Sequence, residues 1–199
     1  MVFNYAIRAI AVLIAKLLTW LLAPVMALRF YRQEESKVTG YPSQFPGKLR
    51  EHIDWPFQWA STFDDCADAM FYSGRMTGVT QAQYDASKWI RYKARVLWLW
   101  RNPAYTFARD LGYDQTGLEV TTVVDQSALW DAGYPNTTYR TFTNAYGHRG
   151  FLYERQIHLC FQFFFEMVLG YKIPWKNERK NRAMVAVRFT IKRYQKQEV

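Results

Sequence analysis

Residues 5–30 read YAIRAIAVLIAKLLTWLLAPVMALRF, and this apolar stretch decides how the chain is organised. It is long enough to cross a bilayer as a helix, because about 20 apolar residues suffice for that. Arg8 lies near one end and can extend its guanidinium to the headgroups. Lys16 lies near the middle and costs roughly 3 kcal/mol on insertion scales, which the surrounding aliphatic side chains offset. We therefore expect residues 1–32 to form an apolar membrane-anchor helix.

The expected anchor side chains are those that would meet lipid or the headgroup layer in a spanning helix. They are Ile10, Leu13, Lys16, Leu17, Trp20, Leu21 and Arg29.

Other interpretations of this stretch remain open. Arg8, Lys16 and Thr19 fall within about 80° of one another at about 100° per residue, so the helix has a narrow polar stripe. A helix lying in the membrane interface with that stripe toward water satisfies the same sequence. A cleavable signal peptide would place Val25 and Ala27 before the cut, but the lysine inside the apolar region argues against it. Burial of the helix within an assembly is a further possibility.

The charges beyond the helix predict its orientation. Arg29, Arg32 and Lys37 follow it, and the positive-inside rule then places the C-terminal domain in the cytoplasm if the helix spans. The chain has two cysteines, Cys66 and Cys160. Two are too few for a disulfide scaffold, which fits a reducing compartment.

A polar linker and one domain are expected after the helix. Residues 33–48 carry two glycines and two prolines and indicate the linker, and residues 49–199 are expected to fold as a single α+β domain. Thr80 and Gln83 form a capping-box pattern that predicts a helix start. Pro103 disfavours helical geometry at Asn102 and ends that helix. A second, short helix follows, so helices are expected over residues 80–111.

The hydrophobic period changes to two after Gly117, which predicts strands over residues 117–193. Alternation over 156–165 predicts one half-buried strand with Ile157 facing inward and His158 outward. Gly170 suggests a turn before another strand that begins at Tyr171. The predicted fold class is α+β, with an N-terminal membrane helix, a helical middle and a C-terminal antiparallel β-sheet.

The formal charge of +9 is concentrated at the C-terminal end. The segment from Tyr171 to Val199 holds nine Lys or Arg residues against two Glu. Such a segment attracts anionic lipid or nucleic acid, and lipid needs fewer assumptions because a membrane helix is already expected. The residues predicted to bind an anionic surface are Arg179, Lys180, Arg182, Arg188 and Lys192.

The sequence offers little for catalysis. Asp64, Asp65 and Asp68 form D-D-x-x-D, a pattern that holds Mg²⁺ in prenyl-diphosphate enzymes, but no second acidic motif accompanies it. His158 and Cys160 lie two residues apart, which more often means a surface histidine near an inert thiol than a nucleophilic pair. Signatures of nucleotide binding and serine hydrolysis are absent. We predict no catalytic residue, no metal and no cofactor.

A core motif supplies a family resemblance. The run from Arg95 to Phe107, RVLWLWRNPAYTF, resembles the W-L-W-R-N-P-A-Y core of an uncharacterised family of small tailed-bacteriophage proteins. Those proteins also tend to open with an apolar, Pro-containing segment and to carry an Asp-rich stretch before the core. The resemblance implies a phage origin and no particular mechanism.

The sequence is compatible with three functions. The first is a non-enzymatic phage accessory protein at the host inner membrane, with membrane lipid and a phage or host envelope protein as partners. The second is a virion structural or ejected component. The third is an enzyme acting on lipid or nucleic acid through Asp64, Asp65, Asp68 or His158.

Overall fold

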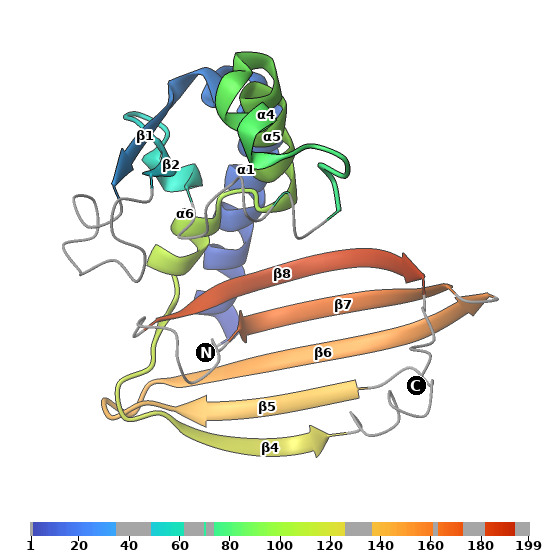
Figure 1. The fold of residues 1–199 in the computed structure, drawn as a ribbon. Coiled ribbons are helices and arrows are strands. Elements are labelled where there is room, and N and C mark those ends of the chain that lie inside the picture. Colours follow the sequence, from blue (N-terminus) through green and yellow to red (C-terminus); the bar gives the residue numbers. More distant parts are fainter. Residues whose placement is uncertain are drawn as a thin grey trace. The chain divides into compact units, whose positions relative to one another are not determined.

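A computed structural model describes residues 2–34, 49–61, 70, 74–125, 137–160, 163–172 and 182–193. The fold is α+β, as predicted, with an N-terminal apolar helix, a helical middle and a C-terminal antiparallel sheet (Figure 1). Its contacts divide the chain into two compact units. One, which we call the sheet unit, joins Met1–Leu13 to Ala108–Val199; the other, the helical unit, is Ile14–Phe107. The predicted domain limits of 1–32, 33–48 and 49–199 stay predictions, and each unit is described by itself.

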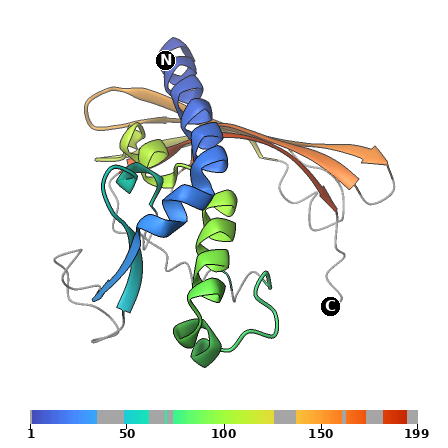
Figure 2. The same cartoon turned by 90° about the horizontal axis from the view of Figure 1, so that it is seen from above.

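Helix α1 (Val2–Met26) contributes residues to both units. It continues through a short 3-10 turn, η1 (Ala27–Arg29), into the first strand, and Figure 2 shows the chain turning at this point. The predicted apolar helix over residues 5–30 is therefore present. Pro24 lies inside its last turn.

The helical unit contains a two-stranded ribbon that the sequence did not reveal. Strand β1 (Phe30–Glu34) pairs antiparallel with β2 (Leu49–Ile53), and Arg32 lies opposite Glu51. The first two residues of the predicted linker thus belong to β1, while residues 35–48 lie outside the described residues. A short 3-10 turn, η2 (Gln58–Ala60), follows.

The predicted helix start is confirmed by its cap. The Thr80 hydroxyl accepts a hydrogen bond from the Gln83 amide at 3.2 Å, and the Gln83 side chain accepts one from the Thr80 amide at 2.9 Å. One continuous helix does not follow, however. Helix α4 (Gln81–Ala86) ends at Ser87, and the Ser87 hydroxyl caps a new helix, α5 (Lys88–Arg101).

Helix α5 ends before Pro103, as predicted, with Asn102 as its C-cap. Helix α6 (Tyr105–Asp110) follows. The core of the helical unit lies between the end of α1, the ribbon and α5. Its fully buried members include Met26, Tyr84, Trp98 and Leu99, and the Phe30 ring meets the Trp98 ring edge-on at 5.9 Å.

The sheet unit is built on six antiparallel strands in the order β3-β8-β7-β6-β5-β4. Their bounds are β3 Tyr113–Asp114, β4 Glu119–Asp125, β5 Thr137–Thr143, β6 Arg149–Cys160, β7 Phe163–Lys172 and β8 Arg182–Arg193. Strands β4, β5 and β8 lie within residues 117–193, where strands were expected. The short β3 lies before that range, and β6 begins seven residues before the single strand expected over 156–165.

Two predictions about the sheet are wrong. The single strand expected over 156–165 is the meeting point of two strands, since β6 ends at Cys160 and β7 begins at Phe163. Gly170 does not make a turn. It lies inside β7, opposite Leu152 on one side and Ala186 on the other. A Cβ at this position would lie 2.1 Å from the Phe151 carbonyl oxygen, so close approach of two backbones explains the glycine.

The predicted inward position of Ile157 is also wrong, whereas His158 is exposed as predicted. Ile157 is 41% exposed, whereas Phe164 and Val168 of the opposite face are buried. Ile157 lies across from Phe165, which lies across from Ile191. Alternation fixes which residues share a face but does not say which face becomes covered.

Candidate functional site

The outward surface of α1 is apolar along its whole length. The exposed residues of α1, apart from Asn4, are all apolar. At about 100° per residue they occupy an arc of about 160°. This outward arc consists of Val2, Phe3, Ile7, Ile10, Leu13, Ile14, Leu17, Leu18, Trp20, Leu21, Pro24 and Val25.

The opposite arc of α1 is buried and carries small side chains. Ala9, Ala15 and Ala23 are buried, as are Val12 and Met26. Small residues at helical spacing let neighbouring elements approach the helix closely. Length and composition make α1 with η1 a candidate membrane span, and 33% of its apolar window is buried inside the protein.

The polar residues of α1 point toward the protein. The Arg8 guanidinium donates to the Leu111 carbonyl at 3.1 Å and to the Gly112 carbonyl at 3.2 Å. The Thr19 hydroxyl is fully buried and donates to the Ala15 carbonyl at 2.9 Å. Lys16 is half-buried. Arg8 and Thr19 thus have partners within the protein, whereas the interfacial alternative expected the whole polar stripe to face water.

The expected anchor residues divide accordingly. Five of them lie on the outward arc, namely Ile10, Leu13, Leu17, Trp20 and Leu21. Lys16 lies toward the protein side. Arg29 follows α1 and forms an exposed ion pair with Asp54 at 3.2 Å.

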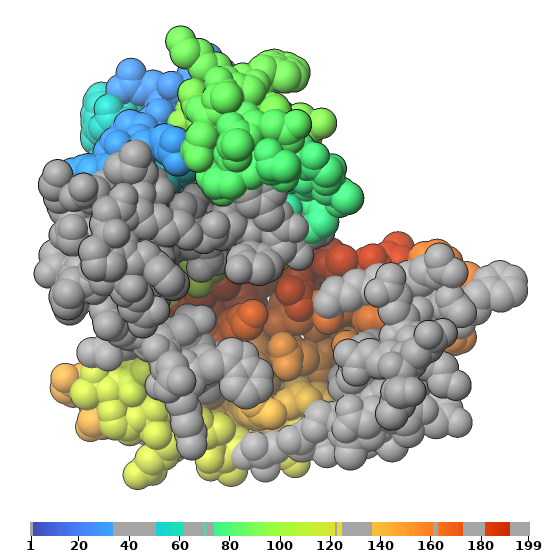
Figure 3. All heavy atoms as spheres, viewed as in Figure 1, coloured from blue at the N-terminus to red at the C-terminus, as the bar shows by residue number. Residues whose placement is uncertain are grey.

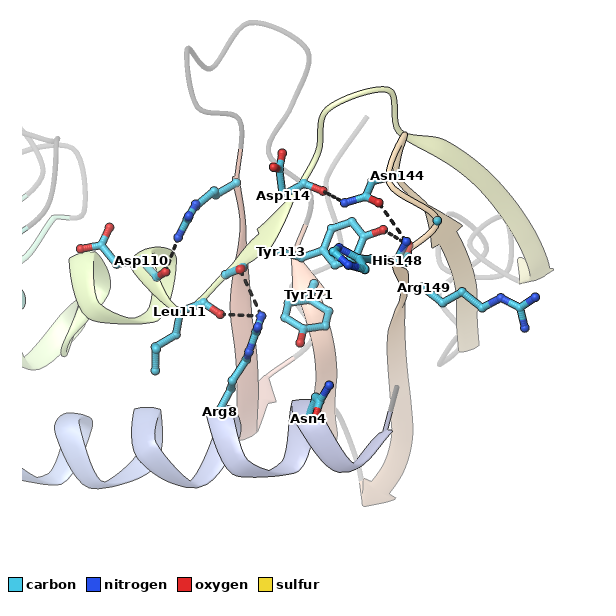
Figure 4. A pocket seen from close by; sticks show the side chains of 13 residues that line it. Asn4, Arg8, Asp110, Leu111, Tyr113, Asp114, Asn144, His148, Arg149 and Tyr171 are labelled. Carbon is cyan, nitrogen blue, oxygen red and sulfur yellow. Dashed lines mark hydrogen bonds between the residues drawn. The ribbon is translucent and has the colours of Figure 1, made fainter.

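A polar cavity of about 720 Å³ lies in the sheet unit at the end of α1 that carries Asn4 and Arg8 (Figure 4). Its other lining residues are Asp110, Leu111, Gly112, Tyr113, Asp114, Asn144, Gly147, His148, Arg149, Tyr171 and Arg182.

Aromatic rings and one buried amide build the inner wall of this cavity. Tyr113 meets the Phe142 ring at 5.0 Å and the Tyr171 ring at 5.5 Å, and its hydroxyl donates to the His148 carbonyl. Burial raises the pKa of Tyr113. The buried Asn144 side chain donates to the Asp114 carbonyl at 3.1 Å and accepts from the His148 amide at 3.0 Å. These contacts fix the turn between β5 and β6.

The charged groups of the cavity are mixed in sign. Arg182 donates to the Asp110 carbonyl, and Figure 4 shows Arg149 pointing away from the other labelled side chains. The Asp114 carboxylate accepts from the Thr116 amide at 3.0 Å and from its hydroxyl at 2.8 Å. These bonds, led by the backbone one, lower the pKa of Asp114. Many hydrogen-bond donors around the cavity are already bound to backbone carbonyls. We therefore interpret these contacts as holding one end of the sheet together.

Of the residues that line the cavity, only Arg182 was among the predicted site residues, as part of the predicted basic surface. A turn signal was present in Asn144-Ala145-Tyr146-Gly147-His148, between two strand-like runs. This signal predicts the turn between β5 and β6. It does not predict the contact between the cavity and α1, because that contact joins Arg8 to Leu111, about a hundred positions away in the sequence.

The predicted basic surface is only partly within the described residues. Arg179, Lys180 and the side chain of Lys192 lie outside them. Arg188 forms an ion pair with the buried Glu166 at 2.5 Å. Arg182 and Arg188 are six residues apart on β8, about 20 Å at strand spacing, so the structure does not bring these two together. Binding of an anionic surface by this set stays a prediction.

Of the predicted metal and nucleophile candidates, the structure describes only His158 and Cys160. Asp64, Asp65 and Asp68 lie outside the described residues. Within the described part of the chain, no group of three or more His, Cys, Asp or Glu side chains is placed to hold a metal. Cys160 is an exposed free thiol at the end of β6.

Comparison with known proteins places the chain in a family. The model of a family of unknown function, DUF7338, matches residues 1–196. The chain belongs to this family. No curated protein and no solved structure matches it.

Proposed function

We propose that this DUF7338 protein is a membrane-associated accessory protein that acts through lipid or protein contacts. The observation that carries the proposal is the outward arc of α1, on which the exposed residues other than Asn4 are apolar. Burying a Leu or Ile side chain is worth roughly 1.5–3 kcal/mol, so several such side chains supply enough free energy for stable membrane association.

The direction of the polar groups supports lipid as the surrounding of this arc. Arg8 and Thr19 have hydrogen-bond acceptors within the protein, so these two polar groups do not need partners in the bilayer. A membrane penalises unpaired polar groups heavily. An apolar outer side with polar groups turned inward is the arrangement that lipid selects.

The proposal also includes a phage origin and a location at the host inner membrane with the C-terminal domain in the cytoplasm. The phage origin is supported by the resemblance of the WLWRNPAY run, residues 98–105, to small tailed-phage proteins. The basic residues that follow α1 favour the cytoplasmic side of the membrane, and the hydrogen bond from the Tyr5 hydroxyl to the Ala186 carbonyl keeps the start of α1 on the same side as the C-terminal strands. Protease added to spheroplasts tests the orientation, because a cytoplasmic C-terminal tag resists digestion and an external tag is lost.

Vesicle flotation of the full-length protein tests membrane association. We expect the triple substitution Ile14→Gln, Leu17→Gln and Leu21→Gln to reduce flotation with phosphatidylcholine vesicles at least tenfold. These side chains are exposed, so their loss leaves the protein's own packing intact. The matched control, Val120→Gln with Val123→Gln, changes exposed apolar residues of β4 and should float like the wild type. Equal flotation of the triple variant and the wild type would reject the proposal.

A further inference from the structure

A second hollow lies in the helical unit, beside the end of α1. Its volume is about 270 Å³, and it is lined by Ala27, Leu28, Lys88, Arg91, Tyr92 and Arg95. One wall of the hollow is the η1 turn. The other wall is one face of α5, because the four lining residues from α5 are spaced three or four positions apart. In Figure 3 the blue atoms that follow α1 lie directly beside the green atoms of α4 and α5.

The hollow carries positive charge that no lining carboxylate balances within the described residues. Arg91 donates to the Tyr84 carbonyl at 3.1 Å and to the Asp85 carbonyl, and these neutral acceptors orient its guanidinium without cancelling its charge. Lys88 is exposed. Arg95 is different, because its guanidinium is held by Glu51 at 2.6 Å. Lys88 and Arg91 therefore supply the net charge of the hollow.

The nearest acidic side chain on α4 is also occupied. The Asp85 carboxylate pairs with Arg32 at 2.9 Å and accepts from Gln81 at 3.2 Å. Asp85 is not a lining residue of the hollow. An anion that enters the hollow thus meets two uncompensated cations and the Tyr92 side chain.

Apolar side chains border the hollow on the outside. Leu28 is 71% exposed and continues the spacing of Leu21 and Val25 on the outward arc. Trp89 is 68% exposed and stacks on the Tyr92 ring at 5.6 Å. Trp and Tyr side chains favour the boundary between hydrocarbon and headgroups. A ligand that fits both features is an anionic amphiphile.

We propose that this hollow binds the phosphate of an anionic phospholipid whose acyl chains contact the outward arc of α1. Its volume is below the 300–1,000 Å³ of pockets that enclose a whole drug-sized molecule, which suits a headgroup phosphate with its chains outside. The inference rests on the proposed membrane association and adds a lipid class and a binding site to it.

The test measures binding of the full-length protein to phosphatidylcholine vesicles with and without phosphatidylglycerol. We expect Lys88→Gln to lower the affinity for the phosphatidylglycerol vesicles about fivefold, since one cation near an anionic surface is worth about that much. Binding to phosphatidylcholine alone should not change. The matched control is Lys93→Gln, which removes the same charge from an exposed position of α5 that does not line the hollow, and it should change the affinity less than twofold.

The outcomes separate this inference from the proposed function. Equal effects of Lys88→Gln and Lys93→Gln, or equal binding of the wild type to both kinds of vesicle, would overturn the headgroup site while membrane association stands. Absence of binding to any vesicle would overturn the proposed function itself. A free phosphate ion is tested with inorganic phosphate, followed by tryptophan fluorescence. One outcome would reject the lipid as the ligand. In it, phosphate causes a saturable fluorescence change that Lys88→Gln abolishes, while Lys88→Gln and the wild type bind phosphatidylglycerol vesicles equally.

Discussion

The Glu51 carboxylate connects four elements of the helical unit. It is 3% exposed, it accepts from Arg95 at 2.8 Å and from the Tyr84 hydroxyl at 3.1 Å, and Arg32 lies 3.6 Å away. Its partners come from β1, α4 and α5. A buried charge with several partners holds these elements in one arrangement, and neutralising it removes the carboxylate that compensates the largely buried Arg95 guanidinium.

Glu51→Gln should therefore destabilise the protein by about 3 kcal/mol, as breaking a buried ion pair does. The measurement is the free energy of unfolding from denaturant titration. Asp54→Asn serves as the control, because its ion pair with Arg29 has both side chains about half exposed and such pairs contribute less than about 1 kcal/mol. Equal losses for the two variants would contradict the structural role of Glu51.

Asp114 should titrate below the ordinary pKa of an aspartate, because two hydrogen bonds from Thr116 favour its ionised form. A folded-state pKa below the unfolded value contributes stability above the unfolded pKa, and this contribution is lost as the pH falls through the folded-state pKa. Thr116→Val removes the hydroxyl donor and keeps the amide, so it should raise the pKa. Carboxyl NMR titration measures both values, with the exposed Thr121→Val on β4 as the control. An unchanged midpoint in Thr116→Val would refute the assignment.

At the scale of the element, strand β7 depends on Gly170. Its φ of +114° is outside the range of ordinary side chains, and a Cβ would collide with the Phe151 carbonyl oxygen. Gly170→Ala should cost about 3 kcal/mol, since neither the strand nor its neighbour can move without breaking the ladder.

Gly147→Ala is the matched comparison for that experiment. Gly147 also has a positive φ, of +75°, but nothing lies within 4 Å of the position of its Cβ. Its substitution should cost about 1 kcal/mol, from backbone strain alone. Denaturant midpoints of the two variants check the difference, and equal midpoints would show that the contact with Phe151 is unimportant.

The elements that the sequence predicts correctly are those with local signals. Thr80 and Gln83 are three residues apart, and Pro103 acts on the residue before it, so both ends of the α4–α5 segment can be predicted from neighbours in the chain. The break at Ser87 has only a weak local signal, because a serine in a helical pattern is also compatible with an exposed helix position.

The errors in the sheet have a different cause. The end of β6 at Cys160, the place of Gly170 inside β7 and the exposure of Ile157 all depend on which strands pair and on which face is covered. Those properties are set by residues far apart in the sequence. The hollow beside α1 was missed for the same reason, since Leu28 and Lys88 meet only in the folded helical unit.

At the scale of the whole molecule, α1 is a structural member of both units. Tyr5 meets the Phe151 ring at 4.9 Å and donates to the Ala186 carbonyl at 2.7 Å in the sheet unit. Ala23 and Met26 are fully buried in the core of the helical unit. Helix α1 therefore contributes buried side chains to both units and has a structural role of its own.

Deletion of residues 2–30 should therefore disrupt folding as well as membrane association. We expect the truncated chain to lose the cooperative unfolding transition and the near-ultraviolet circular dichroism of the full-length protein, because both cores lose buried side chains. The outward triple variant Ile14→Gln, Leu17→Gln, Leu21→Gln should keep both properties. A truncated chain that folds cooperatively would show that α1 is a separable anchor.

The two sides of α1 should also have different histories of substitution within the family. Ala9, Ala15 and Ala23 are limited by the space beneath them, so larger residues should be rare at these positions. Ile10 and Leu21 on the outer side need only to remain apolar, so leucine, isoleucine, valine and phenylalanine should exchange there freely. One helix would thus evolve at two rates, slowly where its side chains are buried against the protein and quickly where they are exposed.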